Sequence, residues 1–215
     1  EVAERLANEA VKPERQSQIV ELGGVELLVP LTESKDIDTQ RLAAHALANL
    51  SVNPRNQKII AAGKGLDNLI SLLSVKSPYV QGHASKALAN IGVYRIIKRK
   101  IAAACGIGPL IRIADKAPTD VALEAIAALA NLAVDDQNEL DIVESGGLTP
   151  ILYAAGSSDL DLQSQAARAL RNLSVNPQNR KRFHQCVGAV STLRKLANST
   201  DTKVAEQATK ALANI

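Results

Sequence analysis

A short apolar sequence motif that contains asparagine recurs through this chain at an almost constant spacing. Successive copies of the asparagine are 41 residues apart, except for a final step of 42. The asparagines are Asn8, Asn49, Asn90, Asn131, Asn172 and Asn214. A period of roughly 20 to 50 residues indicates an array of stacked units rather than one or two ordinary domains. One polar residue per unit, on an otherwise apolar helix, predicts a ladder of amide groups along one surface.

Each unit is expected to contain three helices. In residues 53–93, Asn53-Pro54 can begin a short helix, because asparagine caps helices and proline is tolerated in the first turn. Glycines within 63–65 end that helix, and a second helix follows with apolar residues at helical spacing. Ser77-Pro78 then begins a longer third helix. The chain divides into the end of a preceding unit, 1–11, and units 12–52, 53–93, 94–134, 135–175 and 176–215.

Glycines mark the bend between the first and second helices of the units. They are Gly24, Gly65, Gly106 and Gly147, with Gly188 assigned to the fifth unit after one inserted residue. We expect glycine here because a sharp bend requires conformations that other residues rarely adopt. Such units cannot bury their apolar faces alone, so the sequence predicts an all-α solenoid with one continuous core. Uncapped ends at Glu1 and Ile215 predict further units, or a capping element, in a longer protein.

Composition narrows the class of protein. The net charge is +3, from 25 basic and 22 acidic residues, which does not indicate nucleic-acid binding. No apolar run approaches the ~20 residues of a membrane span. The two cysteines, Cys105 and Cys186, predict reduced and buried thiols in an intracellular protein. We therefore expect a cytoplasmic location, with a nuclear or peripheral membrane location left open.

Two basic clusters lie on first helices, two units apart. They are Lys98-Arg99-Lys100 and Arg180-Lys181-Arg182, and the unit between them carries Glu139 and Asp141 at the equivalent place. This interruption argues against a continuous strip for a membrane or a nucleic acid. We interpret both clusters as a solvated edge, and expect membrane contact to be indirect at most.

No catalytic or metal-binding pattern is evident in the sequence. His45, His83 and His184 have no spacing that converges on a metal or pairs with a nucleophile. Glycines occur singly or in pairs at bends, and not as a phosphate-binding loop. The sequence therefore predicts a binding protein without cofactor, metal or enzymatic activity.

Together these features resemble the armadillo repeat family over essentially the whole chain. The most specific are the Asn-Leu-Ser-Val-Asn-Pro runs at 49–54 and 172–177, and Gly-Gly-Leu-Thr-Pro-Ile-Leu at 146–152. HEAT repeats, which usually have two main helices, fit less well. The resemblance implies a right-handed superhelix whose third helices line a concave groove, where the repeated asparagines bond to the main chain of an extended segment. The matching positions are Asn49, Asn90, Asn131 and Asn172, while Asn8 and Asn214 lie on incomplete or terminal units.

The ladder also has a reason in the chemistry of the amide. Asparagine offers one donor end and one acceptor end, which can pair with the C=O and N–H of a bound peptide. Helices pack about 8–10 Å apart and an extended chain rises about 3.3 Å per residue. Successive asparagines would therefore meet every second or third residue of the ligand. The alternative is that these asparagines bond to their own loops, as asparagine often does.

The position one helical turn before each asparagine predicts the charge of the ligand. In order it holds Glu4, His45, Lys86, Ala127, Arg168 and Lys210, with Arg41 and Arg171 nearby on the same helices. Nuclear-import members of the family place tryptophan there, but this chain has none. A basic lining favours carboxylate-bearing or phosphorylated segments, and is more similar to the groove of catenin-type members. The alternative is that these are solvated charges.

We therefore expect a scaffold that binds a protein partner through an extended acidic or phosphorylated segment. Two alternatives remain open. The first is a regulatory or localising domain of a larger, membrane-anchored or catalytic protein. The second is self-association through the uncapped ends.

Overall fold

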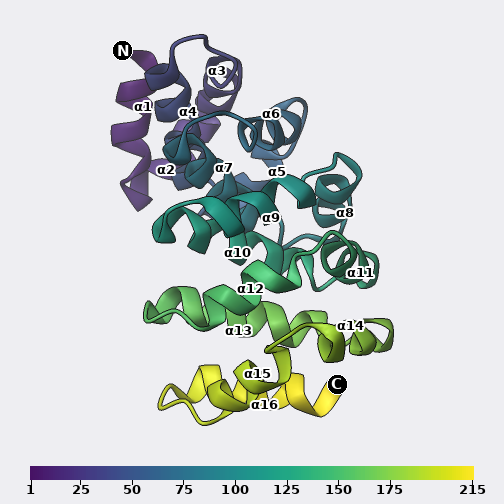
Figure 1. Cartoon of the computed structure of the whole chain (residues 1–215). Coiled ribbons are helices and arrows are strands. Elements are labelled where there is room, and N and C mark those ends of the chain that lie inside the picture. The colour runs from purple at the N-terminus through teal and green to yellow at the C-terminus, as the bar shows by residue number, and fades with distance from the viewer. The chain divides into compact units, whose positions relative to one another are not determined.

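The computed structural model describes all residues from 1 to 215, and they are helical almost throughout. Sixteen α-helices and one short 3-10 helix follow each other without a β-strand, as the sequence predicts. The helices group into two compact units, Glu1–Gly106 and Ile107–Ile215 (Figure 1). No helix combines the length and the apolar character that crossing a membrane would require.

The first unit, drawn in purple to teal in Figure 1, stacks its third helices side by side. Helix α4 packs between α1 and α7, while α3 packs on α4 and α6 packs on α7. Its helices are α1 (Val2–Ala10), α2 (Pro13–Glu21), α3 (Gly24–Leu31), α4 (Ile37–Leu50), α5 (Pro54–Ile60), α6 (Gly65–Leu72), α7 (Pro78–Ile91) and α8 (Arg95–Ala103).

The second unit repeats this arrangement, with α13 packed between α10 and α16. Helices α9, α12 and α15 pack on α10, α13 and α16 respectively. The elements are α9 (Ile107–Lys116), α10 (Thr119–Leu132), α11 (Asp136–Glu144), α12 (Leu148–Ala155), α13 (Leu160–Leu173), η1 (Pro177–Asn179), α14 (Arg180–Gln185), α15 (Ala189–Ala197) and α16 (Thr202–Asn214).

Helix starts follow the capping pattern that the sequence predicts. The Asn53 side chain accepts a hydrogen bond from Arg55 N–H at the start of α5, with Pro54 in the first turn. Ser77 accepts from Val80 N–H at the start of α7. Asp36 caps α4 in the same way. Each cap satisfies one of the N–H groups that the first turn of a helix leaves unpaired.

Small apolar side chains let the third helices pack closely. In α4, alanines at 43, 44, 46 and 48 are fully buried together with Leu47 and Leu50. In α7, the face that the helical spacing predicts is also buried: Val80, Ala84, Ala87, Leu88 and Ile91. The core is therefore continuous within each unit and consists largely of alanine, leucine and isoleucine.

A second set of asparagines, which the sequence reading missed, joins neighbouring repeats from inside. Asn56 Nδ2 donates to Leu50 O at 3.1 Å and to Gln16 O at 3.2 Å. Asn179 Nδ2 donates in the same way to Leu173 O at 2.9 Å and to Glu139 O at 3.3 Å. Leu50 and Leu173 are the last residues of third helices, whose final carbonyls lack partners within the helix, and the other two carbonyls lie inside the first helix of the preceding repeat. Asn138 donates to Leu132 O.

The residue after this inner asparagine changes its chemistry between repeats. Gln57 Nε2 donates to Ser51 O at 2.9 Å, whereas the equivalent Glu139 is a buried carboxyl that accepts from Asn176 N–H at 2.9 Å. Burial raises the pKa of Glu139 to about 7, with Asp136 and Asp135 adding repulsion. The Glu139 side chain is therefore partly protonated near neutral pH.

The glycines at the bends have a different function from the one that the sequence suggested. Positive φ angles fall on Gly23, Gly63, Gly146 and Gly188, and also on Cys105. The regularly spaced glycines are instead needed for close approach: a Cβ at Gly147 would lie 2.8 Å from Ile142 O. Because Gly188 has φ +84, it corresponds to Gly146 and not to Gly147.

Two further expectations are wrong. Cys105 is exposed and Cys186 is partly exposed, so neither thiol is buried. Cys105 lies two residues after α8 in the left-handed conformation, with φ 59, and this turn lies at the surface. Within the first basic cluster, Lys98 is only 8% exposed, so that part of the edge is not solvated.

Replacement of Cys105 by glycine should stabilise the protein. A left-handed conformation costs a residue with a side chain about 1–2 kcal/mol, part of which glycine loses again through its greater freedom in the unfolded chain. We expect Cys105→Gly to raise the free energy of unfolding by up to about 1 kcal/mol, measured in urea. The control is Ala104→Gly, where φ is −84, and it should destabilise the protein. Equal effects of the two variants would contradict this account.

Candidate functional site

The third helices of the first unit place several of the predicted binding residues on one surface. His45 and Asn49 come from α4, and Lys86 and Asn90 come from α7, and all four are partly exposed. The surface also contains His83, one turn before Lys86, which sequence reasoning did not select. His83 stacks on His45 from the neighbouring helix, with ring centroids 4.6 Å apart and an angle of 31° between the rings.

The amide groups of this unit bond to the protein through their nitrogen ends. Asn90 Nδ2 donates to Ser51 Oγ at 3.0 Å, and Ser51 Oγ donates in turn to Ala48 O at 2.6 Å. Asn49 Nδ2 lies 3.0 Å from His45 Nε2 on the same helix. The oxygen ends of Asn49 and Asn90 therefore remain available to accept a hydrogen bond.

Positive charge surrounds the two imidazoles. Burial is the main cause that lowers the pKa of His83 to about 4, and repulsion by His45, Arg41 and Lys86 adds to it. Burial also lowers the pKa of His45, again with Lys86 and Arg41 contributing. Arg41 forms an exposed ion pair with Asp38 at 3.5 Å, and Lys86 is partly exposed. Both imidazoles are therefore neutral at pH 7.

In the second unit, Arg168 is half-buried between α10 and α13. Its guanidinium donates to Asn131 Oδ1 at 2.8 Å and to Gln165 Oε1 at 2.6 Å, with a longer contact to Ala127 O. Its Nε is buried without a hydrogen-bond partner, and burial lowers the pKa of the group. The guanidinium therefore contacts only neutral acceptors, and no carboxylate faces it.

The remaining predicted residues of the second unit are bonded to the protein. Asn172 is 7% exposed; its Nδ2 donates to Ala130 O at 2.9 Å and its Oδ1 accepts from Arg171 at 3.2 Å. Asn214 Nδ2 donates to Ser174 Oγ at 3.0 Å. Lys210 forms an ion pair with Glu206 at 2.5 Å, so its charge is already offset.

The partners of Asn90, Asn172 and Asn214 depend on the residue two positions after the preceding asparagine. Asn90 and Asn214 follow repeats that carry Ser51 and Ser174 there, and they donate to these hydroxyls. Asn172 follows a repeat with Ala133, and donates to a main-chain carbonyl instead. The free protein thus uses these amides to join repeats. Their bonding to a peptide stays a prediction.

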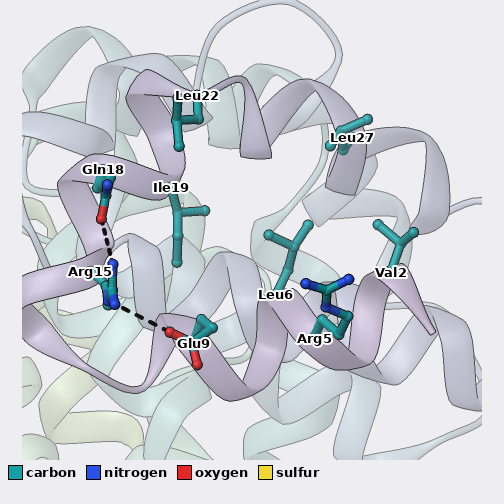
Figure 2. A pocket seen from close by; sticks show the side chains of 9 residues that line it. All are labelled: Val2, Arg5, Leu6, Glu9, Arg15, Gln18, Ile19, Leu22 and Leu27. Atoms are coloured by element: carbon teal, nitrogen blue, oxygen red, sulfur yellow. Dashed lines mark hydrogen bonds and ion pairs between the residues drawn. The ribbon is translucent and has the colours of Figure 1, made fainter.

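A separate apolar pocket of about 330 Å³ lies where α1, α2 and α3 meet (Figure 2). Its apolar lining comes from Leu6 and Ile19 and from the exposed Val2, Leu22 and Leu27. Figure 2 shows Arg15 at one side, hydrogen-bonded to Gln18 and paired with Glu9. Neither this pocket nor the third-helix surface contains a group of three or more metal-ligating side chains.

Comparison with known proteins identifies related sequences and structures. Residues 12–52 and 135–175 match the armadillo/beta-catenin-like repeat family. An engineered protein of known crystal structure is 36% identical, with a TM-score of 0.90 over 99% of this chain and 87% of that protein. A structure of computationally designed armadillo repeat proteins for modular peptide recognition is 26% identical, with a TM-score of 0.88 over 99% and 91%.

A third solved structure is a designed armadillo repeat protein in complex with the peptide (KR)4. It is 24% identical to this chain, with a TM-score of 0.84 over 99% of this chain and 90% of that protein. Among curated proteins, no sequence matches this chain.

Truncation of the amides should affect stability according to their burial. Asn172→Ala removes a buried donor and leaves Ala130 O without its partner, so we expect a loss of about 1 kcal/mol in the free energy of unfolding. Asn49→Ala removes only a contact within one helix at a partly exposed site, and should change stability by less than about 0.5 kcal/mol. Urea unfolding of both variants measures the difference. Equal losses would contradict the inter-repeat function of Asn172.

Proposed function

Because this chain belongs to the armadillo repeat family, we propose that it is a scaffold that binds an extended segment of a partner protein along its third helices. The designed relatives support this proposal, since one group was made for modular peptide recognition and another protein holds a peptide. Binding, rather than catalysis, is the activity that we propose for these residues.

The charge around Arg168 favours an acidic ligand, and this observation carries the proposal. A half-buried cation without a counter-ion is costly, because neutral hydrogen-bond acceptors replace only part of its hydration. Arg168 has such neutral partners in Asn131 and Gln165. A carboxylate or phosphate of a ligand would supply the missing negative charge, and arginine binds both groups well.

Lys86 is a further, partly exposed cation in the first unit, and Arg171 lies beside Asn172 in the second. The designed protein that holds (KR)4 takes a ligand of the opposite sign. A row of lysines and arginines would be repelled by the cations of this chain, so we propose an acidic or phosphorylated segment.

The asparagines would then contribute through one end of the amide. The oxygen ends of Asn49 and Asn90 can accept N–H groups from the main chain of the segment, while the nitrogen of Asn90 stays bonded to Ser51. Each hydrogen bond adds only about 0.5–1.5 kcal/mol. The amides would fix the register of the ligand, and the charged groups would determine which ligand binds.

Charge reversal at Lys86 and Arg168 should weaken the binding of an acidic probe. We would use a fluorescent decapeptide of alternating glutamate and serine, and its counterpart of alternating lysine and serine. Loss of two attractive groups at about 1.5–3 kcal/mol each predicts at least tenfold weaker binding of the acidic probe by Lys86→Glu/Arg168→Glu. Fluorescence anisotropy at several salt concentrations measures the affinity, and its salt dependence should also decrease.

A matched control carries the same change in net charge elsewhere. Lys76 and Lys181 are exposed and lie outside the third helices, so Lys76→Glu/Lys181→Glu should bind almost as well as the unmodified protein. Thermal unfolding establishes that both variants are folded. The proposal fails if both variants lose affinity equally, or if the unmodified protein prefers the lysine probe.

The apolar pocket at α1–α3 favours a second function, which is end-to-end self-association. Leu22 is 77% exposed and Leu27 55%, and both line the pocket, so apolar surface gathers there that a partner could cover. Residues 1–33 carry seven acidic and three basic side chains, whereas 176–215 carry seven basic and two acidic ones. We propose that the basic end of a second copy of the chain covers the acidic end with its pocket, which is a head-to-tail contact.

This second function predicts a mass that depends on concentration. At low salt, the unmodified chain should form dimers and longer assemblies at tens of micromolar, as measured by analytical ultracentrifugation. Leu22→Glu/Leu27→Glu should remain monomeric, because it removes the apolar surface and adds repulsion among acidic groups. A monomer at every concentration and salt tested would rule out the head-to-tail contact.

A further inference from the structure

We propose that Arg41, His45, His83 and Lys86 form one anion site on the first unit, and that this site takes up a proton when it binds a carboxylate. The proposal deepens the acidic-segment function and rests on it for the identity of the ligand. It adds His83 to the binding residues and makes the affinity depend on pH.

The four side chains come from two packed helices. Arg41 lies one turn before His45 on α4, and His83 lies one turn before Lys86 on α7. The stacked imidazoles join the two helices, with their ring centroids 4.6 Å apart. All four residues are partly exposed, so an anion can reach them from solvent.

The charges around the imidazoles are positive. Arg41 and Lys86 both lower the pKa of His45 and of His83, and no carboxylate shifts either pKa. Asp38 reaches Arg41, but 75% of its side chain is exposed. The helices packed against α4 and α7 carry other charged groups, and none of them shifts the pKa of either imidazole. They are Glu4, Arg5, Glu9, Glu14, Arg15, Glu21, Glu26, Arg55, Lys58 and Asp67. In the sequence, Glu124 stands at the position equivalent to His83 in the next repeat.

At neutral pH the free site contains two positive charges, on Arg41 and Lys86, and two neutral imidazoles. Burial and the neighbouring cations keep the imidazoles unprotonated. A bound carboxylate offsets this repulsion and accepts a hydrogen bond from a protonated ring, so it favours the imidazolium form. Histidine is suited to this response because its ordinary pKa, near 6.5, lies close to physiological pH.

The direction of the pH dependence follows from linkage. The bound state holds one proton more than the free state between the two pKa values of the imidazole, so affinity rises as the pH falls through this range. If the ligand restores a pKa near 6.5 to one ring, affinity should rise about tenfold between pH 7.5 and 5.5. Glutamate side chains of a ligand stay largely ionised over this range, because their pKa is about 4.3.

The test measures the affinity for the glutamate–serine decapeptide at pH 7.5, 6.5 and 5.5 and at constant ionic strength. We expect about a tenfold gain for the unmodified protein and less than twofold for His45→Asn/His83→Asn, in which no imidazole can take up the proton. The control is His184→Asn on α14, which removes an imidazole that is not on α4 or α7 and should keep the tenfold gain. Thermal unfolding at each pH establishes that the variants are folded.

A second arm follows the imidazoles directly by NMR and does not depend on a peptide. Sulfate keeps its charge over this pH range, and it should raise the apparent pKa of His83 relative to chloride at equal ionic strength. An unchanged pKa in sulfate, or a tenfold gain retained by the double histidine variant, would overturn the proton-linked site. A raised pKa in sulfate without peptide binding at any pH would uphold the anion site and overturn the acidic-segment function.

Discussion

The bond from a buried side-chain amide to the last carbonyls of a third helix is the interaction on which the rest of this structure depends. A helix leaves its final carbonyls unpaired, and burial makes that costly. Asn56 and Asn179 each satisfy two carbonyls, one in the preceding third helix and one in the first helix of the preceding repeat. Apolar packing alone would allow neighbouring repeats to slide, whereas these directional bonds fix the positions of α4 and α13, which carry His45 and Arg168.

The same chemistry recurs on the third-helix surface and limits what a ligand can meet there. Asn90 and Asn172 use their Nδ2 groups to bond to the preceding repeat. A ligand that competed for these donors would weaken the joint between repeats, and would gain only about 1 kcal/mol for each exchange. Asn49 and Asn90 therefore offer acceptors more readily than donors, whereas the oxygens of Asn131 and Asn172 already accept from Arg168 and Arg171. The charge preference of the surface must come from other positions, chiefly those one turn before each asparagine.

Periodicity predicted the parts of this structure that depend on local chemistry. The three helices of 53–93 and the caps Asn53 and Ser77 follow from residue types at fixed places. Features that depend on contacts between segments distant in the sequence were harder to predict. A close approach to a carbonyl and a positive φ both require glycine. The sequence alone therefore could not show that Gly147 makes the close approach and Gly146 has the positive φ. His45 and His83 are 38 residues apart, and their contact follows from how α4 and α7 pack rather than from the 41-residue repeat.

The position one turn before each asparagine differs between repeats, and the energetic cost of each residue there depends on its burial. An exposed lysine such as Lys210 finds a partner on its own helix, in Glu206, and contributes little. Arg168 is half-buried, and its position between Asn131 and Gln165 gives it hydrogen bonds but no opposite charge. The free protein thus bears an electrostatic cost at Arg168 that an anionic ligand would remove. Under the proposed function, binding energy would come from relieving this cost as well as from new contacts, so that Arg168 would select the partner and the asparagines would align it.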